Sequence, residues 1–203
     1  MIAVINYGLG NLHSVQKAIA YVGGDAVVTD NPEAILQAEK VVLPGVGAFA
    51  DGMQGLESRG LVDAVKKAAV SGKPMLGICL GMQLFFEESE EQGDHQGLGL
   101  LKGKVKAFRQ PGIKVPQIGW NQLEISKDAN LMQDIQPGDY VYFNHGYYCA
   151  PAEQSDILTV TEYGVRFASS VLRKNIYGVQ FHPEKSQKVG LQIIRNFVEQ
   201  NHG

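Results

Sequence analysis

Short apolar runs that do not alternate with polar residues constrain the fold of this chain more than any other feature. They lie at residues 2–5, 26–28, 41–43 and 75–78 and are separated by amphipathic stretches with helical spacing. Strands that are apolar on both faces must be covered on both faces, as in a parallel sheet flanked by helices. The first part of the chain therefore predicts alternating strands and helices, with helices over residues 12–22, 32–38 and 61–70 and after Leu80.

The second part of the chain has a different pattern. From Gly97 onward, alternating segments at 105–108, 123–125, 140–143, 158–160 and 167–172 are separated by Gly, Pro and Asn, which indicates largely antiparallel strands. A last strand at residues 177–181 precedes a loop and a terminal amphipathic helix. We expect an α/β fold with an open, mixed, mainly parallel central sheet flanked by helices and an additional antiparallel strand region. No repeat or linker divides the chain, so residues 1–203 are predicted to form a single domain.

Composition narrows the functional classes. The 203-residue chain has a formal net charge of -3, so it carries no broad basic field for nucleic acid or for an anionic membrane. No segment is apolar for long enough to cross a bilayer, and the start of the chain lacks a signal-peptide pattern. Its two cysteines, Cys79 and Cys149, are too few for a disulfide framework, so a cytoplasmic location is expected. The histidines and cysteines show no metal-ligand spacing, and we expect no metal.

One cysteine occupies a turn that is typical of a catalytic nucleophile. Cys79 is the centre of Gly77-Ile-Cys79-Leu-Gly81, between a predicted strand and a predicted helix. Such a nucleophile elbow presents its central side chain at the carboxyl edge of the sheet, where open α/β sheets bind ligands. The N–H groups and dipole of the following helix would also stabilise a thiolate. An isolated cysteine in a strand is usually a small buried hydrophobic residue, but strand, turn and helix in this order favour the nucleophile.

A thiolate that attacks an amide needs an acid to protonate the departing nitrogen. His182 is the best candidate, because it directly follows an apolar strand in the segment Val179-Gln-Phe-His182-Pro-Glu184-Lys185. The proline stiffens the turn, and the carboxylate of Glu184 can turn back to the imidazole and fix its tautomer and charge. Taken alone, this segment could be a surface loop. Together with the elbow, it predicts a Cys-His-Glu triad.

The glycine-rich segment Pro44-Gly-Val46-Gly47-Ala-Phe49 follows the third predicted strand. Two glycines around one residue let the backbone approach a ligand closely. An N–H group from this loop could join that of Leu80 in binding an oxyanion. The loop lacks the lysine and the spacing of a phosphate-binding loop, and its position one strand-helix unit before the elbow supports the oxyanion interpretation.

The motifs PGVG, GICLGMQ and FHPEK, in this order along the chain, resemble those of the class I, or triad, glutamine amidotransferases, whose fold is flavodoxin-like. Within that family, the segments NYGLGNL, PGVGAF, GMQLFFEESEE and IGWN are most similar to the glutaminase subunits of imidazole glycerol phosphate synthases. The resemblance implies that Cys79 attacks the side-chain amide of glutamine, that His182 moves the proton and that Glu184 orients the imidazole. The resulting cysteinyl thioester would be hydrolysed to glutamate without any cofactor.

The resemblance also implies roles for residues around the triad. Backbone N–H groups of Val46 and Leu80 would form an oxyanion hole. The positions similar to those that bind glutamine in the family are Gly47, Gln83, Glu91, Gly146 and Tyr147. For Gln83 the alternative is a helix cap or a solvent contact, and for Glu91 it is the solvated end of a charged helix. Residues 143–148 read FNHGYY where related chains tend to have a Val-His-Ser or Val-His-Thr run, and His145 is expected to support this strand and not to act as a base.

The ammonia would pass to a partner. The resemblance implies a heterodimer with a (β/α)8 barrel cyclase subunit, which makes imidazole glycerol phosphate and aminoimidazole carboxamide ribotide in histidine biosynthesis. The implied interface positions are Asn11, Trp120, Tyr142 and Lys185, although Trp120 could be a core aromatic residue and Lys185 a plain surface cation.

Two alternative functions remain. One is the glutaminase subunit of an anthranilate, aminodeoxychorismate, guanylate or pyridoxal phosphate synthase, against which the segments YGLGN and GWN argue. The other is a non-catalytic partner-binding module of the same fold, which the presence of Cys79, His182 and Glu184 disfavours.

Overall fold

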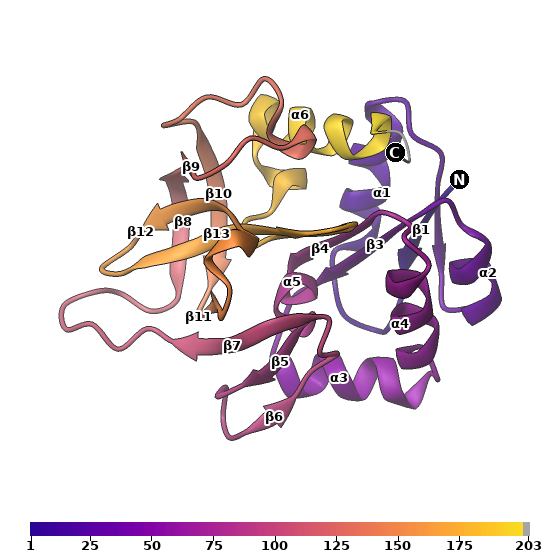
Figure 1. Ribbon diagram of the computed structural model, residues 1–203, viewed down its shortest axis with the longest axis horizontal. Helices are drawn as coiled ribbons and strands as arrows, with labels where there is room; N and C mark the ends of the chain where they lie inside the picture. The colour runs from indigo at the N-terminus through magenta and orange to yellow at the C-terminus, as the bar shows by residue number, and fades with distance from the viewer. Residues whose placement is uncertain (201–203) are drawn as a thin grey trace.

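The computed structural model describes residues 1–200, and an eight-stranded sheet with the order β2-β1-β3-β4-β14-β13-β12-β9 forms its centre (Figure 1). The parallel strands are β2 (Ala26–Thr29), β1 (Ile2–Ile5), β3 (Lys40–Gly45), β4 (Met75–Cys79) and β14 (Ile176–Val179). The sheet continues in antiparallel pairing through β13 (Arg166–Arg173), β12 (Ile157–Glu162) and β9 (Glu124–Ile125). This mixed, mainly parallel sheet confirms the predicted fold class.

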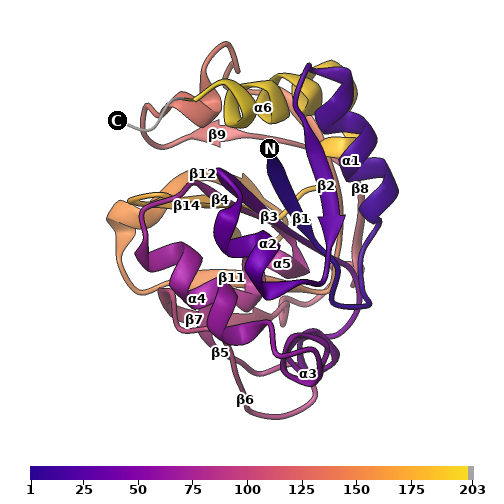
Figure 2. The same ribbon diagram turned by 90° about the vertical axis from the view of Figure 1, so that its right-hand side faces the viewer.

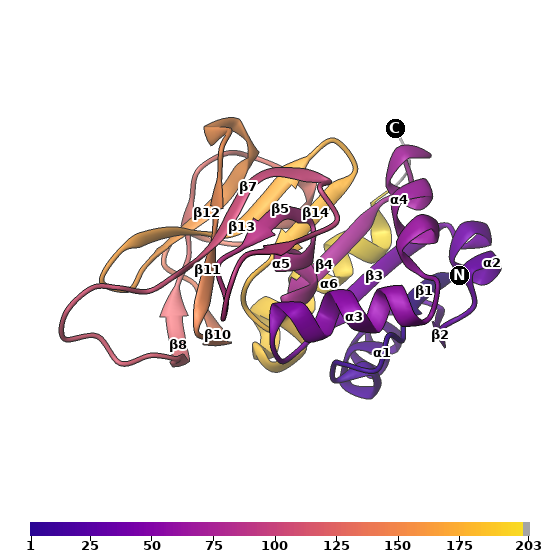
Figure 3. The same ribbon diagram turned by 90° about the horizontal axis from the view of Figure 1, so that it is seen from below.

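Helices cover both faces of the parallel strands, as Figure 2 shows. On one face lie α1 (Leu12–Tyr21) and α6 (Gln187–Glu199), and on the other lie α2 (Pro32–Gln37), α3 (Phe49–Ser58) and α4 (Val62–Val70). Figure 3 shows α3 and α4 in front of β3 and β4. Successive residues of a strand point to opposite faces, so Val42 packs with the α1 and α6 side chains and Leu43 with those of α3 and α4. This two-sided burial explains why the strands are apolar without alternation.

Two smaller sheets lie beside the antiparallel strands. β8 (Gln117–Gln122) pairs with β10 (Tyr140–His145), and a four-stranded sheet contains β11 (Tyr147–Pro151), β7 (Leu101–Ala107), β5 (Phe86–Ser89) and β6 (His95–Gln96). Short 3-10 helices span Asn130–Met132 (η1), Gln154–Asp156 (η2) and Pro183–Lys185 (η3). Only Gly146 separates β10 from β11, so this segment leaves one small sheet and enters the other. Within residues 1–200, no helix is long and apolar enough to cross a membrane.

The sequence prediction was wrong between residues 80 and 91. The helix that begins at Leu80, α5, ends at Leu84, and residues 86–89 form strand β5 instead of the solvated end of a helix. Two of the strand's side chains, Phe86 and Ser89, are buried, because β5 pairs in parallel with β7. Pairing with a strand more than ten residues away overrides the local helical pattern.

Helix α3 and strands β8 and β11 were not predicted at all. Glycine is unfavourable inside a helix, and α3 contains two that packing requires. A Cβ atom at Gly55 would lie 2.4 Å from the carbonyl oxygen of Tyr7, and one at Gly52 would lie 3.1 Å from the Leu84 side chain. These glycines weaken the helical signal in the sequence, but they allow α3 to pack closely against the segments around Tyr7 and α5.

Candidate active site

Cys79 lies at the carboxyl end of β4, in a backbone conformation that few residues adopt. Its φ is 54° and its ψ is -109°, and α5 begins at the next residue. A non-glycine residue in this region is strained, and such strain is common at functional sites. The turn also requires small neighbours, because a Cβ atom at Gly81 would lie 1.7 Å from the carbonyl oxygen of Leu43 and one at Gly77 would lie 2.6 Å from the Phe85 ring. This is the geometry of a nucleophile elbow.

His182 and Glu184 form a buried hydrogen-bonded pair in the turn that follows β14. Nδ1 of His182 lies 2.9 Å from Oε1 of Glu184, and the two side chains are 2% and 1% exposed. Burial by itself would lower the pKa of the imidazole, but the interaction with the Cys79 sulfur and the hydrogen bond and charge of Glu184 outweigh it and raise the His182 pKa well above its usual value. The arrangement therefore favours an imidazolium ion next to the sulfur and can move a proton to or from an attacked amide.

The sulfur of Cys79 opens into a small cavity of about 190 Å³. Its lining contains Val46, Gly47, Cys79, Leu80, Gln83, Glu91, Pro116, Asn144, His145, Gly146 and Tyr147. The volume is below the range of about 300–1,000 Å³ that is typical for drug-sized ligands, so it suits a small metabolite. Cys79 is only 5% exposed, which makes this cavity its route to a substrate. Among residues 1–200, no three His, Cys, Asp or Glu side chains gather closely enough to hold a metal ion.

Gln83 and Glu91 both belong to this cavity. The Gln83 side chain is 4% exposed, and its Nε2 donates to the carbonyl of Tyr147 and to Oε1 of Gln180, each at 3.1 Å. It is therefore neither a helix cap nor a solvent contact. Oε2 of the half-buried Glu91 accepts a 2.8 Å hydrogen bond from the backbone N–H of Phe49. Burial raises the pKa of this carboxyl group, and the Phe49 N–H partly opposes the effect.

His145 lines the cavity but is already engaged elsewhere. Its Nδ1 lies 2.7 Å from the carbonyl oxygen of Tyr147, and its Nε2 lies 3.0 Å from Oε1 of Gln117. The ring packs beside Phe143 and Phe167, and burial lowers the His145 pKa to about 4. A neutral ring with both nitrogens in use is suited to holding the β10–β11 segment in place and not to accepting the proton of a thiol.

Comparison with known proteins assigns a family to this site. The family model described as glutamine amidotransferase class-I matches residues 3–201. The chain belongs to the class I glutamine amidotransferases.

Among curated relatives, the chain is 52% identical to "Imidazole glycerol phosphate synthase subunit HisH" of Moorella thermoacetica, over 98% of this chain and 94% of that protein. It is 49% identical to the HisH subunit of Syntrophotalea carbinolica, over 97% of this chain and 98% of the relative. A solved structure described as a glutamine amidotransferase shares the fold, with a TM-score of 0.76, 17% identity and coverage of 98% of both chains.

Three of the four residues expected at a partner interface cluster on the amidotransferase surface. Trp120 on β8 is 45% exposed, so it is not a core aromatic residue. Its ring meets that of Tyr142 on β10 at 6.0 Å in an edge-to-face arrangement, and Nζ of Lys185 lies 5.9 Å from the centre of the Tyr142 ring. Asn11 is exposed and serves as the N-cap of α1, where its Oδ1 accepts from the N–H of Ser14 at 3.4 Å.

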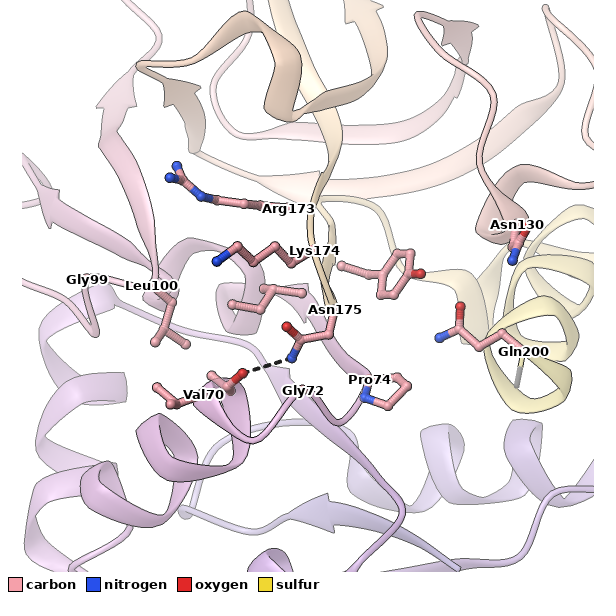
Figure 4. A pocket seen from close by; sticks show the side chains of 13 residues that line it. Val70, Gly72, Pro74, Gly99, Leu100, Asn130, Arg173, Lys174, Asn175 and Gln200 are labelled. Carbon is pink, nitrogen blue, oxygen red and sulfur yellow. Dashed lines mark hydrogen bonds between the residues drawn. The ribbon is translucent and has the colours of Figure 1, made fainter. Parts of the chain in front are cut away.

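A larger cavity of about 840 Å³ lies at the opposite edge of the sheet, where β4 and β14 begin. Figure 4 shows Gly99 and Leu100 on its left and Asn130 and Gln200 on its right. None of the side chains expected to carry chemistry lines it. Because ligands of open α/β sheets bind at the carboxyl ends of the strands, the smaller cavity at Cys79 is the candidate active site of this amidotransferase.

Two groups that touch the sulfur were missed in the sequence. The backbone carbonyl of Asn144 lies 3.8 Å from Sγ of Cys79, and Nε2 of Gln180 donates to Sγ at 3.6 Å. The sequence pattern assigned residue 180 to an apolar strand without a function of its own. The available signal was a polar residue in this apolar run, two residues before the histidine. The contact itself follows from the parallel pairing of β4 with β14, in which Ile78 lies beside Val179.

Proposed function

We propose that this amidotransferase hydrolyses glutamine to glutamate and ammonia and delivers the ammonia to a (β/α)8 barrel cyclase subunit of imidazole glycerol phosphate synthase, in the cytoplasm. The observation that carries the proposal is the cavity at Cys79, next to the buried pair of His182 and Glu184. A partner subunit is supported by relatives between 44% and 52% identical over at least 96% of this chain, all called imidazole glycerol phosphate synthase subunit HisH.

In the first half of the reaction, the thiolate of Cys79 attacks the carboxamide carbon of glutamine. The carbonyl double bond becomes a single bond to an oxyanion, which the backbone N–H groups of Val46 and Leu80 would stabilise. Leu80 is the first residue of α5, and the N–H groups of a first helical turn have no partner within the helix. When the oxyanion collapses, the carbon–nitrogen bond breaks and the imidazolium of His182 gives its proton to the departing nitrogen, leaving a thioester.

In the second half, water attacks the thioester while the now neutral imidazole of His182 accepts a proton from it. A second oxyanion forms in the same place and collapses, which releases glutamate and restores the thiolate and the imidazolium. Glu184 stays ionised throughout and holds the imidazole by the hydrogen bond to Nδ1. The sum is glutamine plus water giving glutamate plus ammonia, and no cofactor enters any step.

The far end of the cavity offers groups for the amino-acid part of glutamine. The carboxylate of Glu91 is suited to the α-ammonium group, because it is half-buried and held by a single backbone N–H. The remaining lining at this end is mostly backbone, at Gly47, Gly146 and Tyr147. Backbone recognition tolerates the unusual sequence of residues 143–148, since an N–H or a carbonyl group does not depend on the side chain.

The partner would bind over β8 and β10. Besides Trp120, the large hydrophobic side chains of Ile118 and Tyr140 are 59% and 53% exposed on these two strands. Exposed apolar clusters with aromatic residues and a nearby cation are typical of protein interfaces. β10 also ends beside the catalytic cavity, so a subunit bound here would lie close to where ammonia is released. Asn11 would extend this interface.

The catalytic part of the proposal is tested with Cys79→Ala, assayed for glutamate formation by the purified chain together with its partner. Glutamate release is expected to fall to background while the variant still assembles with the partner. Cys149→Ala is the matched control, because Cys149 is also a buried free cysteine but does not line the cavity. Glutamate release by Cys79→Ala at the rate of the control would overturn the assignment of the nucleophile.

The partner is tested by co-purification with the barrel cyclase of the same organism, followed by titration of Trp120→Ala and Lys185→Ala. Both variants are expected to weaken association or reduce ammonia transfer while the free energy of unfolding changes little. Tyr21→Ala is the control, since Tyr21 is 75% exposed on α1 and belongs to no proposed interface. Equal association and equal ammonia transfer in all three variants would refute the proposed surface.

A further inference from the structure

Gln180 is a buried polar side chain for which the proposed triad gives no role. It directly follows β14 and is 0% exposed. Its backbone N–H donates to the carbonyl of Ser169 at 2.8 Å, and this hydrogen bond fixes the main chain beside the end of β4. Burying an amide is unfavourable unless it is hydrogen-bonded, so the partners of this side chain indicate why a polar residue is present.

A chain of hydrogen bonds determines which end of the Gln180 amide faces Cys79. This series of hydrogen bonds starts at the carbonyl oxygen of Tyr147, which can only accept. The group of Gln83 that lies 3.1 Å from this oxygen must therefore be its NH2 group. The second N–H of the same NH2 group donates to Oε1 of Gln180, also at 3.1 Å. Gln180 must then turn its own NH2 group the other way, where Nε2 lies 3.6 Å from Sγ of Cys79. The orientation thus follows from a backbone carbonyl and not from an arbitrary choice between oxygen and nitrogen.

The two polar contacts of the sulfur favour different protonation states. The carbonyl oxygen of Asn144, 3.8 Å away, can accept a hydrogen bond only from the S–H of the thiol. The N–H of Gln180 donates, and a donor binds a negatively charged acceptor more strongly than a neutral one. Loss of the Gln180 N–H would therefore destabilise the thiolate form of Cys79 more than its thiol form.

We propose that Gln180 is a further catalytic residue, which donates its side-chain N–H to the Cys79 sulfur, stabilises the thiolate and fixes the position of the attacking atom. The inference rests on the proposed glutaminase function and adds to it a donor from the residue that follows β14. In the reaction, this N–H stabilises the negative charge on the sulfur before the attack. It does so again when the thioester is hydrolysed and the thiolate leaves the acyl carbon. The carbonyl end of Gln180 holds Gln83 in turn, so one side chain links the nucleophile to the wall of the cavity.

Other ionisable groups surround the sulfur and remain unchanged when Gln180 is replaced. They are Tyr7 from the loop after β1, Glu91 after β5, His145 on β10, Cys149 on β11, and His182 and Glu184 after β14. A comparison of variants at position 180 therefore isolates the effect of one N–H group on the sulfur.

The test measures how fast iodoacetamide alkylates Cys79 in the full chain as a function of pH, because the thiolate is the reactive form. The modified peptide is quantified by mass spectrometry, and Cys79→Ala shows any reaction elsewhere. Gln180→Met keeps a long unbranched side chain but has no N–H group. The pH at half-maximal alkylation rate is expected to rise by about one unit, which is a change of about tenfold in the ionisation constant of the thiol. Gln180→Glu, with the same shape and a negative charge, is expected to raise it further.

Gln117→Met is the matched control, because it makes the same change at another buried glutamine, which bonds His145 and does not touch the sulfur. The pH at half-maximal alkylation is expected to stay within about 0.3 units of the original. Gln83→Met removes the donor that orients the Gln180 amide, so it is expected to raise the KM for glutamine and to shift the alkylation profile in the same direction as Gln180→Met, by no more than that variant does. A folded Gln180→Met chain with an unchanged alkylation profile would overturn the proposal, even if glutamine turnover fell. If Gln180→Met does not fold, the same criterion applies to Gln180→Glu. A chain in which these shifts occur but which releases no ammonia from glutamine would instead overturn the proposed function.

Discussion

Replacement of Glu184 by glutamine tests whether the charge of this residue supports the imidazole. The glutamine variant Glu184→Gln keeps the shape and retains one oxygen that can accept from Nδ1 of His182, but it removes the negative charge. The pair is 2.9 Å apart and nearly fully buried, so solvent screens the charge little. A hydrogen bond to a charged group contributes about 1.5–3 kcal/mol and a neutral one about 0.5–1.5 kcal/mol. The difference of about 1–2 kcal/mol predicts about a 5- to 30-fold loss of turnover.

The pH dependence of this variant provides a second measurement. Glu184 is one of the groups that raise the His182 pKa, so its neutralisation lowers that pKa and shifts the alkaline loss of activity to lower pH. The stability effect has the corresponding sign. The raised pKa of His182 in the folded chain contributes to the free energy of unfolding. This contribution is fully present below the unfolded-state pKa of about 6.5 and is lost as the pH rises through the folded-state pKa. The difference in the free energy of unfolding between the original chain and Glu184→Gln should therefore shrink as pH increases above about 6.5.

The assay is glutamate release at saturating glutamine in the complex with the partner, combined with urea unfolding at several pH values. Glu124→Gln is the control, because it makes the same chemical change in an exposed pair with Arg166, where the two side chains are 64% and 60% exposed. Exposed ion pairs contribute little, and no change in turnover is expected there. Turnover of Glu184→Gln within twofold of the original chain would refute the proposed role of the carboxylate.

Three further changes test features that surround the site. Lys40→Met removes a buried ammonium group that donates to the carbonyls of Phe197 and Gln200 at the end of α6. Urea unfolding should show that the free energy of unfolding falls by about 2–4 kcal/mol, because the hydrogen bonds of a charged donor are lost and the carbonyls stay buried. His145→Gln should make the free energy of unfolding less sensitive to acid. Because the His145 pKa is about 4 in the folded chain, the original chain loses about 3 kcal/mol of stability between pH 6.5 and 4. Denaturant titrations in which both chains lose stability equally over this range would contradict this. Gly81→Ala forces the elbow backbone to move, because its Cβ atom would lie 1.7 Å from the Leu43 carbonyl oxygen; we expect a destabilisation of about 1–3 kcal/mol with loss of glutamate release, measured on the same preparation.

The strands of the parallel sheet and the triad turns were predictable because their signals are local. Apolar runs such as residues 41–43 reflect burial on both faces of a strand. The glycines around Cys79 reflect the crowding of a single turn, and His182 and Glu184 are only two residues apart. In each case, residues near one another in the chain carry the whole physical cause.

Strand β5 and helix α3 were not predictable, because their causes are distant. Phe86 belongs to a strand only because β7 pairs with it, and the glycines of α3 are required by Tyr7 and Leu84. For Glu91 the sequence left a solvated position as an alternative to a place in the site, and its contact with the N–H of Phe49, forty-two residues earlier in the chain, depends on the tertiary structure.

The sequence by itself determined that a nucleophile elbow follows an apolar strand and that a histidine and a carboxylate share a short turn, since both depend on steric and bonding constraints within a few residues. Only the tertiary structure decided what surrounds the sulfur. The parallel pairing of β4 with β14 brings Gln180 beside Cys79, and β10 brings the carbonyl of Asn144 to the same atom. Such contacts depend on the register and packing of strands that are about a hundred residues apart, which no local pattern encodes.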